Sequence, residues 1–177
     1  MAEALALKGV ATLRYQFPYM ERKARRPDLP AVATATVRAA VALAQRLAPG
    51  LPLIAGGKSF GGRMTSTAQA AEPLPGVRGL AFLGFPLHPP GKPAVTRGEH
   101  LDAVRVPMLF LQGDRDEFAE PLLLRQVLRN LGARAMLHLV NGGDHSFSVP
   151  KKSGRSADDV FAELATTIVD WSAGLVG

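Results

Sequence analysis

A glycine-flanked serine between an apolar run and a helix-forming run constrains the fold of this chain most strongly. Residues 51–63 read LPLIAGGKSFGGR, and residues 57–61 within them match the pattern G-x-S-x-G. On a sharp turn from a strand into a helix, the positions two before and two after the serine must be small. We therefore expect Ser59 on a strained turn between a strand and a helix. A plain glycine-rich turn is the alternative, because a chain with 18 glycines can match this pattern by chance.

The rest of the chain alternates between apolar strands and helices. Hydrophobic periodicity predicts strands at residues 10–15, 51–55, 77–85, 106–111 and 133–140. It predicts helices at residues 31–48, 60–71, 121–131 and 156–175, and the end of a helix at residues 2–8. Residues 16–30 and 86–98 are interrupted by proline and are expected to be irregular loops. Near-continuous apolar strands that alternate with helices favour an α/β fold, a three-layer α/β/α sandwich with a mostly parallel sheet.

Length and composition narrow the class of protein. We interpret the 177 residues as one domain, residues 1–177, large enough to bury its own core. No apolar run reaches the length of a transmembrane helix, and the chain has no cysteine for disulfides or cysteine metal sites. We expect a cytoplasmic protein without a membrane partner and with neither metal nor organic cofactor. The sequence does not indicate its oligomeric state.

The net charge of +6 and the pI of about 10.2 raise the question of a nucleic-acid partner. The basic residues are spread out, apart from a cluster at residues 22–26, and no aromatic residues alternate with that cluster. We favour a solvated basic loop, with a patch for an anion or an acidic partner as the alternative. A nucleic-acid partner is therefore the weakest of these interpretations.

Polar residues follow three of the predicted strands. Ser59 follows the second strand, Asp114 and Asp116 follow the fourth, and His145 follows the fifth. The carboxyl ends of parallel strands meet at one edge of a sheet, where sites form. A serine nucleophile needs an imidazole to take its proton and a carboxylate to orient that imidazole. The order serine, acid, histidine along the chain is that of the α/β hydrolases.

Two choices within this set stay open. Asp116 lies further round its turn than Asp114 and is favoured as the acid, whereas Asp114 is expected to cap the turn. Asp144 adjoins His145 and is interpreted as ordering that loop. His145 could instead be a loop histidine that caps a carbonyl group. His138 is expected to be structural, and His88 and His100 to lie at the surface.

Four segments together resemble a known family. They are GGKSFGGRMTS, RYQFPYMERKARRPD, LQGDRDEF and NGGDHSF. They are similar to the bacterial branch of an α/β-hydrolase-like family that includes testis-expressed proteins and histone-acetyltransferase (NSL) complex subunits, related to dienelactone-hydrolase-like proteins. The resemblance implies Ser59 as nucleophile, Asp116 as acid, His145 as base and the backbone N–H of Phe60 as an oxyanion-hole donor. Phe60 stands where the family usually has methionine.

The start of the chain departs from that family. Its members usually begin with an apolar strand and a glycine-rich loop that gives the second oxyanion donor. The resemblance places this further strand between residues 10–15 and residues 51–55. Without it, we expect either a fragment of a longer protein or a sheet that closes differently, and an activity reduced by the missing donor.

The leading functional hypothesis is a serine hydrolase that acts on a small-molecule ester or related acyl substrate through an acyl-enzyme. A binding or scaffold protein that keeps the fold without catalysis is the second hypothesis, since a fold does not by itself imply activity. Nucleic-acid binding through the basic loop is the third.

Overall fold

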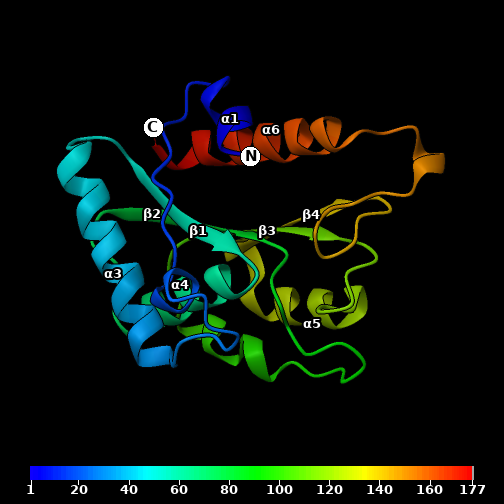
Figure 1. The fold of residues 1–177 in the computed structure, drawn as a ribbon, viewed down its shortest axis with the longest axis horizontal. Helices are drawn as coiled ribbons and strands as arrows, with labels where there is room; N and C mark the ends of the chain where they lie inside the picture. The colour runs from blue at the N-terminus through cyan, green and yellow to red at the C-terminus, as the bar shows by residue number, and fades with distance from the viewer. Residues whose placement is uncertain (177) are drawn as a thin grey trace.

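The computed structural model describes residues 1–176, and its centre is a parallel β-sheet (Figure 1). Within these residues the sheet has four strands in the order β1-β2-β3-β4, each parallel to its neighbour. The strands are β1 (Leu53–Lys58), β2 (Val77–Leu83), β3 (Met108–Gly113) and β4 (Ala135–Val140). Because all four run the same way, their carboxyl ends share one edge of the sheet.

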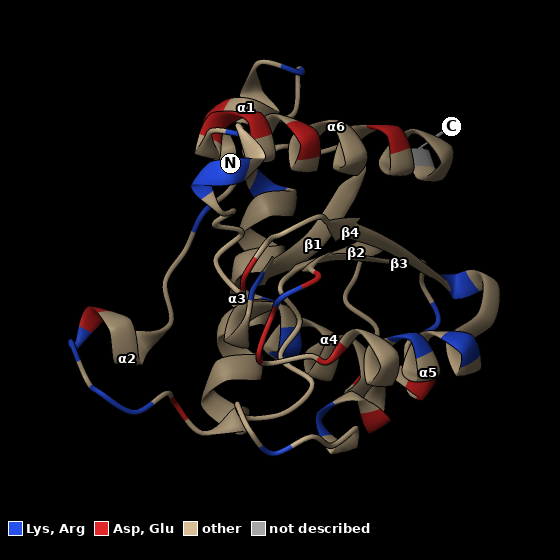
Figure 2. Ribbon diagram, turned by 90° about the vertical axis from the view of Figure 1, so that its right-hand side faces the viewer, with Lys and Arg blue, Asp and Glu red and all other residues tan. Residues whose placement is uncertain are grey.

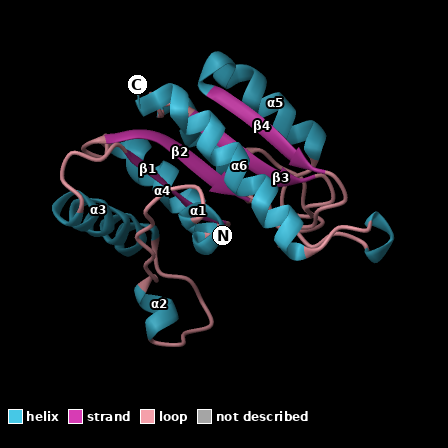
Figure 3. Ribbon diagram, turned by 90° about the horizontal axis from the view of Figure 1, so that it is seen from above, coloured by secondary structure: helices cyan, strands magenta, loops and turns pink. Residues whose placement is uncertain are grey.

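Helices cover both faces of this sheet. The α-helices are α1 (Ala2–Ala6), α2 (Pro18–Glu21), α3 (Pro30–Leu47), α4 (Phe60–Ala71), α5 (Pro121–Leu131) and α6 (Ala157–Val176). Short 3-10 helices lie at η1 (Thr96–Ala103), η2 (Gly132–Arg134) and η3 (Lys151–Ser153). Helices α1 and α6 lie on one face, and α3, α4 and α5 lie on the other (Figures 1 and 3). The predicted three-layer α/β/α sandwich is confirmed.

The alternation of side chains along the strands builds two cores. In β3, Met108 and Phe110 point into the core shared with α3, α4 and α5, whereas Leu109 and Leu111 point into the core under α6. All four side chains are fully buried. A strand buried on both faces reads as a continuous apolar run, which explains why β3 was recognisable from the sequence.

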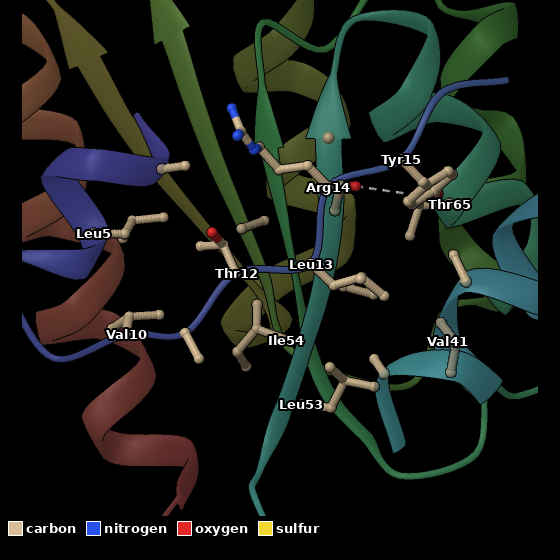
Figure 4. A pocket seen from close by; sticks show the side chains of 18 of the residues that line it. Leu5, Val10, Thr12, Leu13, Arg14, Tyr15, Val41, Leu53, Ile54 and Thr65 are labelled. Atoms are coloured by element: carbon tan, nitrogen blue, oxygen red, sulfur yellow. Dashed lines mark hydrogen bonds between the residues drawn. The ribbon is translucent and has the colours of Figure 1, made fainter. Parts of the chain in front are cut away.

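The prediction of a strand at residues 10–15 is wrong. This segment is irregular and pairs with no strand of the described sheet, which ends at β1. It passes beside β1 and is separated from it by a mostly apolar cavity of about 330 Å³ (Figure 4). Leu13, Leu53 and Ile54 line this cavity. A segment without a hydrogen-bonded neighbour does not form a strand, and residues 10–15 line this cavity opposite β1 instead of pairing with it. The resemblance assigned a further strand to this position.

Two loop predictions also need correction. Residues 16–30 contain the short helix α2, and the predicted loop at residues 86–98 ends inside η1. The basic cluster at residues 22–26 lies in the loop after α2, which extends away from the sheet (Figure 2). Its residues are exposed. Among the helices of residues 1–176, none has the length and apolar character needed to cross a membrane.

A close backbone approach at Gly113 gives a test of this packing. A Cβ atom at Gly113 would overlap the carbonyl oxygen of Gly143, in the loop that carries His145. Because a backbone carbonyl cannot move aside as a side chain can, we expect Gly113→Ala to lower the free energy of unfolding by about 1 to 3 kcal/mol. Urea denaturation measures this change. The control is Gly174→Ala in α6, where a Cβ meets no atom within 4 Å, and which should stabilise by up to about 1 kcal/mol. Equal stabilities for the two variants would contradict the packing.

Candidate active site

Ser59 lies on a sharp turn between β1 and α4. Its backbone has φ 51° and ψ −116°, a left-handed φ that a non-glycine residue rarely adopts. A Cβ at Gly57 would lie 3.1 Å from the backbone carbon of Gly61 and 3.2 Å from the nitrogen of Gly62. A Cβ at Gly62 would lie 2.7 Å from the oxygen of Gly57. Gly57 and Gly62 therefore provide the clearance, whereas a Cβ at Gly61 would lie 3.7 Å from its nearest neighbour, an ordinary contact, so the expectation that the position two after the serine must be small is not met. The turn is the strained strand–serine–helix turn rather than a plain glycine-rich one.

The structure brings Ser59, His145 and Asp116 together in a hydrogen-bonded chain. The Nε2 atom of His145 is 2.8 Å from the Oγ atom of Ser59. The Nδ1 atom of the same ring is 2.8 Å from the Oδ2 atom of Asp116. The three side chains come from the loops that follow β1, β3 and β4, as expected for the carboxyl edge of a parallel sheet.

Asp116 is fully buried and is held by two further donors. It accepts hydrogen bonds from Gln112 Nε2 (2.5 Å) and from the backbone N–H of Phe118 (2.8 Å). Gln112 is itself buried, and its Oε1 accepts a hydrogen bond from the N–H of Phe85. Gln112 was not among the predicted site residues. A polar residue inside the buried run of β3 was the available signal, because buried amides need partners.

The competing carboxylates act on backbone groups. Asp114 accepts a hydrogen bond from the N–H of Gly142 (2.8 Å) and so ties the turn after β3 to the loop after β4. Asp144 accepts hydrogen bonds from the N–H groups of Ser146 and Ser148. Neither side chain contacts the imidazole by a hydrogen bond within the described residues. The expectations for both residues agree with these contacts.

Several neighbours hold His145 in place. The ring of Phe118 lies against the imidazole, with 4.2 Å between centroids. Lys58, which precedes Ser59, donates a hydrogen bond to the carbonyl oxygen of His145. Burial lowers the pKa of the Lys58 ammonium group, while the charges of Asp116 and Asp144 oppose this shift. The contacts with Phe118 and Lys58 support the position in which one edge of the imidazole faces Asp116 and the other faces Ser59.

Phe60 is the first residue of α4, so its N–H has no acceptor within the helix. Its ring packs edge-on against Phe17 and Tyr19, with centroid separations of 5.3 and 5.9 Å. These contacts fix the start of α4 next to Ser59. An N–H at a helix start is suited to bind a developing anion.

Ser59 also borders a cavity of about 310 Å³. The other lining residues are Pro27, Asp28, Pro30, Phe60, Arg63, Pro86, Arg97 and Phe118. They come from the loop after α2, the starts of α3 and α4, the segment after β2, the 3-10 helix η1, and the loop between β3 and α5. A small molecule in this cavity would lie next to Ser59.

The other three histidines make hydrogen bonds that support the fold. His88 is buried, and its Nε2 accepts a hydrogen bond from the N–H of Glu120, so the expectation of a surface position is wrong. His100 is partly buried and lies 2.7 Å from the hydroxyl of Ser66, which corrects the same expectation. The Nε2 atom of His138 lies 2.6 Å from the Oε1 atom of Glu163, which agrees with the expected structural role. The described residues hold no group of three or more histidine, cysteine, aspartate or glutamate side chains arranged for a metal ion.

The environment of His100 predicts a pH dependence of stability. Burial, and then the nearby charge of Arg63, lowers the pKa of His100 from 6.5 to about 4. As the pH falls below 6.5 the unfolded chain binds a proton that the folded chain does not bind, so stability is lost between pH 6.5 and 4. We expect this loss to be about 1 to 2 kcal/mol, after reduction for the partly exposed ring. Denaturation at pH 7 and pH 4.5 should show a smaller loss in His100→Gln than in the wild type. An equal loss in both would contradict the assignment.

Comparison with known proteins shows the family and the fold of this chain. Residues 1–173 match the family described as "Alpha/beta hydrolase domain". An α/β serine hydrolase homologue from Coxiella burnetii is 19% identical with a TM-score of 0.69, over 96% of this chain and 72% of that one. A putative α/β hydrolase from Agrobacterium tumefaciens is 18% identical with a TM-score of 0.69, over 99% and 76%.

A lidless α/β serine hydrolase from Xanthomonas campestris is 23% identical with a TM-score of 0.60, over 84% of this chain and 61% of that one. These structural likenesses are at low identity and show the fold. The family match extends over nearly the whole sequence. This chain belongs to the alpha/beta hydrolase domain family.

Proposed function

We propose that this protein is a serine hydrolase that cleaves a small ester or related acyl substrate through an acyl-enzyme. The observation that carries the proposal is the chain of two 2.8 Å hydrogen bonds from Ser59 through His145 to Asp116. The family membership supports hydrolase chemistry, and the resemblance to the NSL-subunit branch supports the same three residues. Neither identifies the substrate.

In the first half of the reaction, the Oγ atom of Ser59 attacks the acyl carbon as its proton passes to Nε2 of His145. Asp116 accepts the hydrogen bond from Nδ1–H, which holds the ring in the tautomer that leaves Nε2 free to accept that proton. The tetrahedral intermediate then collapses, the bond to the leaving oxygen breaks, and His145 returns its proton to the leaving group. The acyl group is now an ester of Ser59.

In the second half, water attacks the acyl-enzyme while His145 takes one of its protons. The acid is released, and the proton returns to the Oγ atom of Ser59. In both halves the N–H of Phe60 donates to the negatively charged oxygen. Because a single oxyanion donor contributes about 10² to 10³ in rate, we expect slow turnover if no second donor completes the hole.

The test is the hydrolysis of short 4-nitrophenyl esters and the reaction with a fluorophosphonate probe. We expect turnover of acetyl and butyryl esters, and covalent labelling that an ester substrate slows by competition. A folded protein that neither hydrolyses these esters nor reacts with the probe would favour the non-catalytic binding protein instead.

A further inference from the structure

The cavity beside Ser59 has two arginines in its wall, Arg63 and Arg97. Its other walls are mainly proline and phenylalanine, so these two side chains dominate its charge. The mechanism proposed above gives neither arginine a role.

Arg63 is positioned by the same helix that begins at the serine. It lies one turn after Ser59 in α4, and its backbone N–H donates to the carbonyl oxygen of Ser59 (3.1 Å). Its guanidinium carbon is 5.7 Å from the centre of the Phe60 ring. The Nε atom is buried and has no hydrogen-bond partner among residues 1–176. A buried donor without a partner is costly, so this group is suited to receive an acceptor.

Arg97 approaches the same space from η1. Its positive charge is close enough to lower the pKa of Arg63, in addition to the larger effect of burial. Within residues 1–176, neither arginine forms an ion pair with a carboxylate. Two cations that face one cavity without an anion repel each other, and an anion between them removes this repulsion.

Asp28, the one carboxylate among the described lining residues, is already engaged. Asp28 pairs with Arg22 at 2.6 Å and accepts a hydrogen bond from the N–H of Tyr19 at 2.8 Å. Its side chain is only 5% exposed. Asp28 and Arg22 cancel each other, so the charges of Arg63 and Arg97 are left for a ligand.

From this arrangement we propose that Arg63 and Arg97 form a subsite for an anionic group of the substrate. The substrate is then a small ester whose acyl or alcohol part carries a carboxylate or a phosphate. Guanidinium groups bind both anions through paired hydrogen bonds. This proposal rests on the proposed function, because it makes Ser59 the group that attacks the ester bond next to the bound anion.

The test compares two esters of similar size. Mono-4-nitrophenyl glutarate carries a free carboxylate, and 4-nitrophenyl pentanoate does not. We expect the ratio of their kcat/KM values to favour the glutarate in the wild type and to fall about 10- to 100-fold in Arg97→Gln and in Arg63→Gln. Arg63→Lys should restore part of the ratio. If Arg63→Gln does not fold, Arg97→Gln alone decides.

The control is Arg46→Gln, which removes an exposed charge at the end of α3 and should leave the ratio unchanged. A ratio unchanged within about twofold in both Arg63→Gln and Arg97→Gln would overturn the subsite, since one lost charge-assisted contact should exceed that. That outcome would leave the hydrolase proposal intact.

A binding measurement separates the two proposals. In Ser59→Ala, calorimetric titration with glutarate and with inorganic phosphate should show binding of at least one anion, weakened at least about tenfold by Arg97→Gln. The anion that binds identifies carboxylate or phosphate as the recognised group. Arginine-dependent binding by a protein that hydrolyses no ester would sustain the subsite and refute the hydrolase. The subsite would be refuted if neither anion binds, or if Arg63→Gln and Arg97→Gln both leave the binding unchanged.

Discussion

Ser59→Ala is expected to lower kcat for ester hydrolysis by about 10⁴- to 10⁶-fold, because the atom that forms the acyl-enzyme is removed. In the part of the chain that the structure describes, the side chain of Ser59 makes one hydrogen bond, to His145, so its loss should leave the fold intact. Steady-state hydrolysis of 4-nitrophenyl butyrate measures the effect, and thermal unfolding checks the fold.

Ser66→Ala is the matched control. Ser66 is a buried residue of α4 and makes a second serine–histidine hydrogen bond, at 2.7 Å between its Oγ atom and Nε2 of His100. Because the Ser66 hydroxyl does not line the cavity at Ser59, its loss should change kcat by no more than about tenfold. A Ser66→Ala variant as inactive as Ser59→Ala would contradict the assignment of the nucleophile.

Asp116→Asn is expected to lower kcat by about 10⁴-fold. The amide keeps the size of the carboxyl group but presents a donor where Nδ1–H must donate, so the imidazole is driven into the wrong tautomer. It also removes the charge that stabilises the imidazolium formed during attack. Steady-state kinetics of the purified variant, with circular dichroism as the check on folding, measures this loss.

Asp114→Asn separates the two aspartates. Asp114 lies two positions before Asp116, and its carboxylate accepts a hydrogen bond from the N–H of Gly142, whereas that of Asp116 contacts His145. The amide oxygen of asparagine can still accept that hydrogen bond, so we expect at most about a tenfold loss of kcat. The reverse order of effects, with Asp114→Asn the more damaging, would show that the acid has been misassigned.

Much of the central fold could be predicted because local signals agreed with tertiary packing. Helices α4 and α5 begin and end at the predicted residues, since Ser59 and Pro121 mark their starts and Gly132 stops the second. Strand β3 was predicted because both of its faces are buried. The meeting of three loops followed from parallel strands that share one carboxyl edge.

The predictions that failed concern residues whose structure depends on tertiary neighbours that the sequence alone does not identify. Residues 10–15 have the composition of a strand, but strand structure requires a pairing partner, and β1 does not pair with them. His88 follows a buried strand within a proline-rich segment, and its burial depends on the distant backbone of Glu120. Gln112 acquires its position from Asp116 and Phe85, whose spacing only the folded chain defines. The proximity of Arg63 and Arg97 is likewise defined only by the folded chain.

The most direct test is to trap the covalent intermediate. The protein is mixed with 4-nitrophenyl acetate, quenched in acid within seconds, digested, and mapped by mass spectrometry. We predict one acetyl group on the peptide that contains Ser59, absent from Ser59→Ala. Acetyl groups confined to lysines or to another serine, with turnover preserved in Ser59→Ala, would contradict Ser59 as the nucleophile.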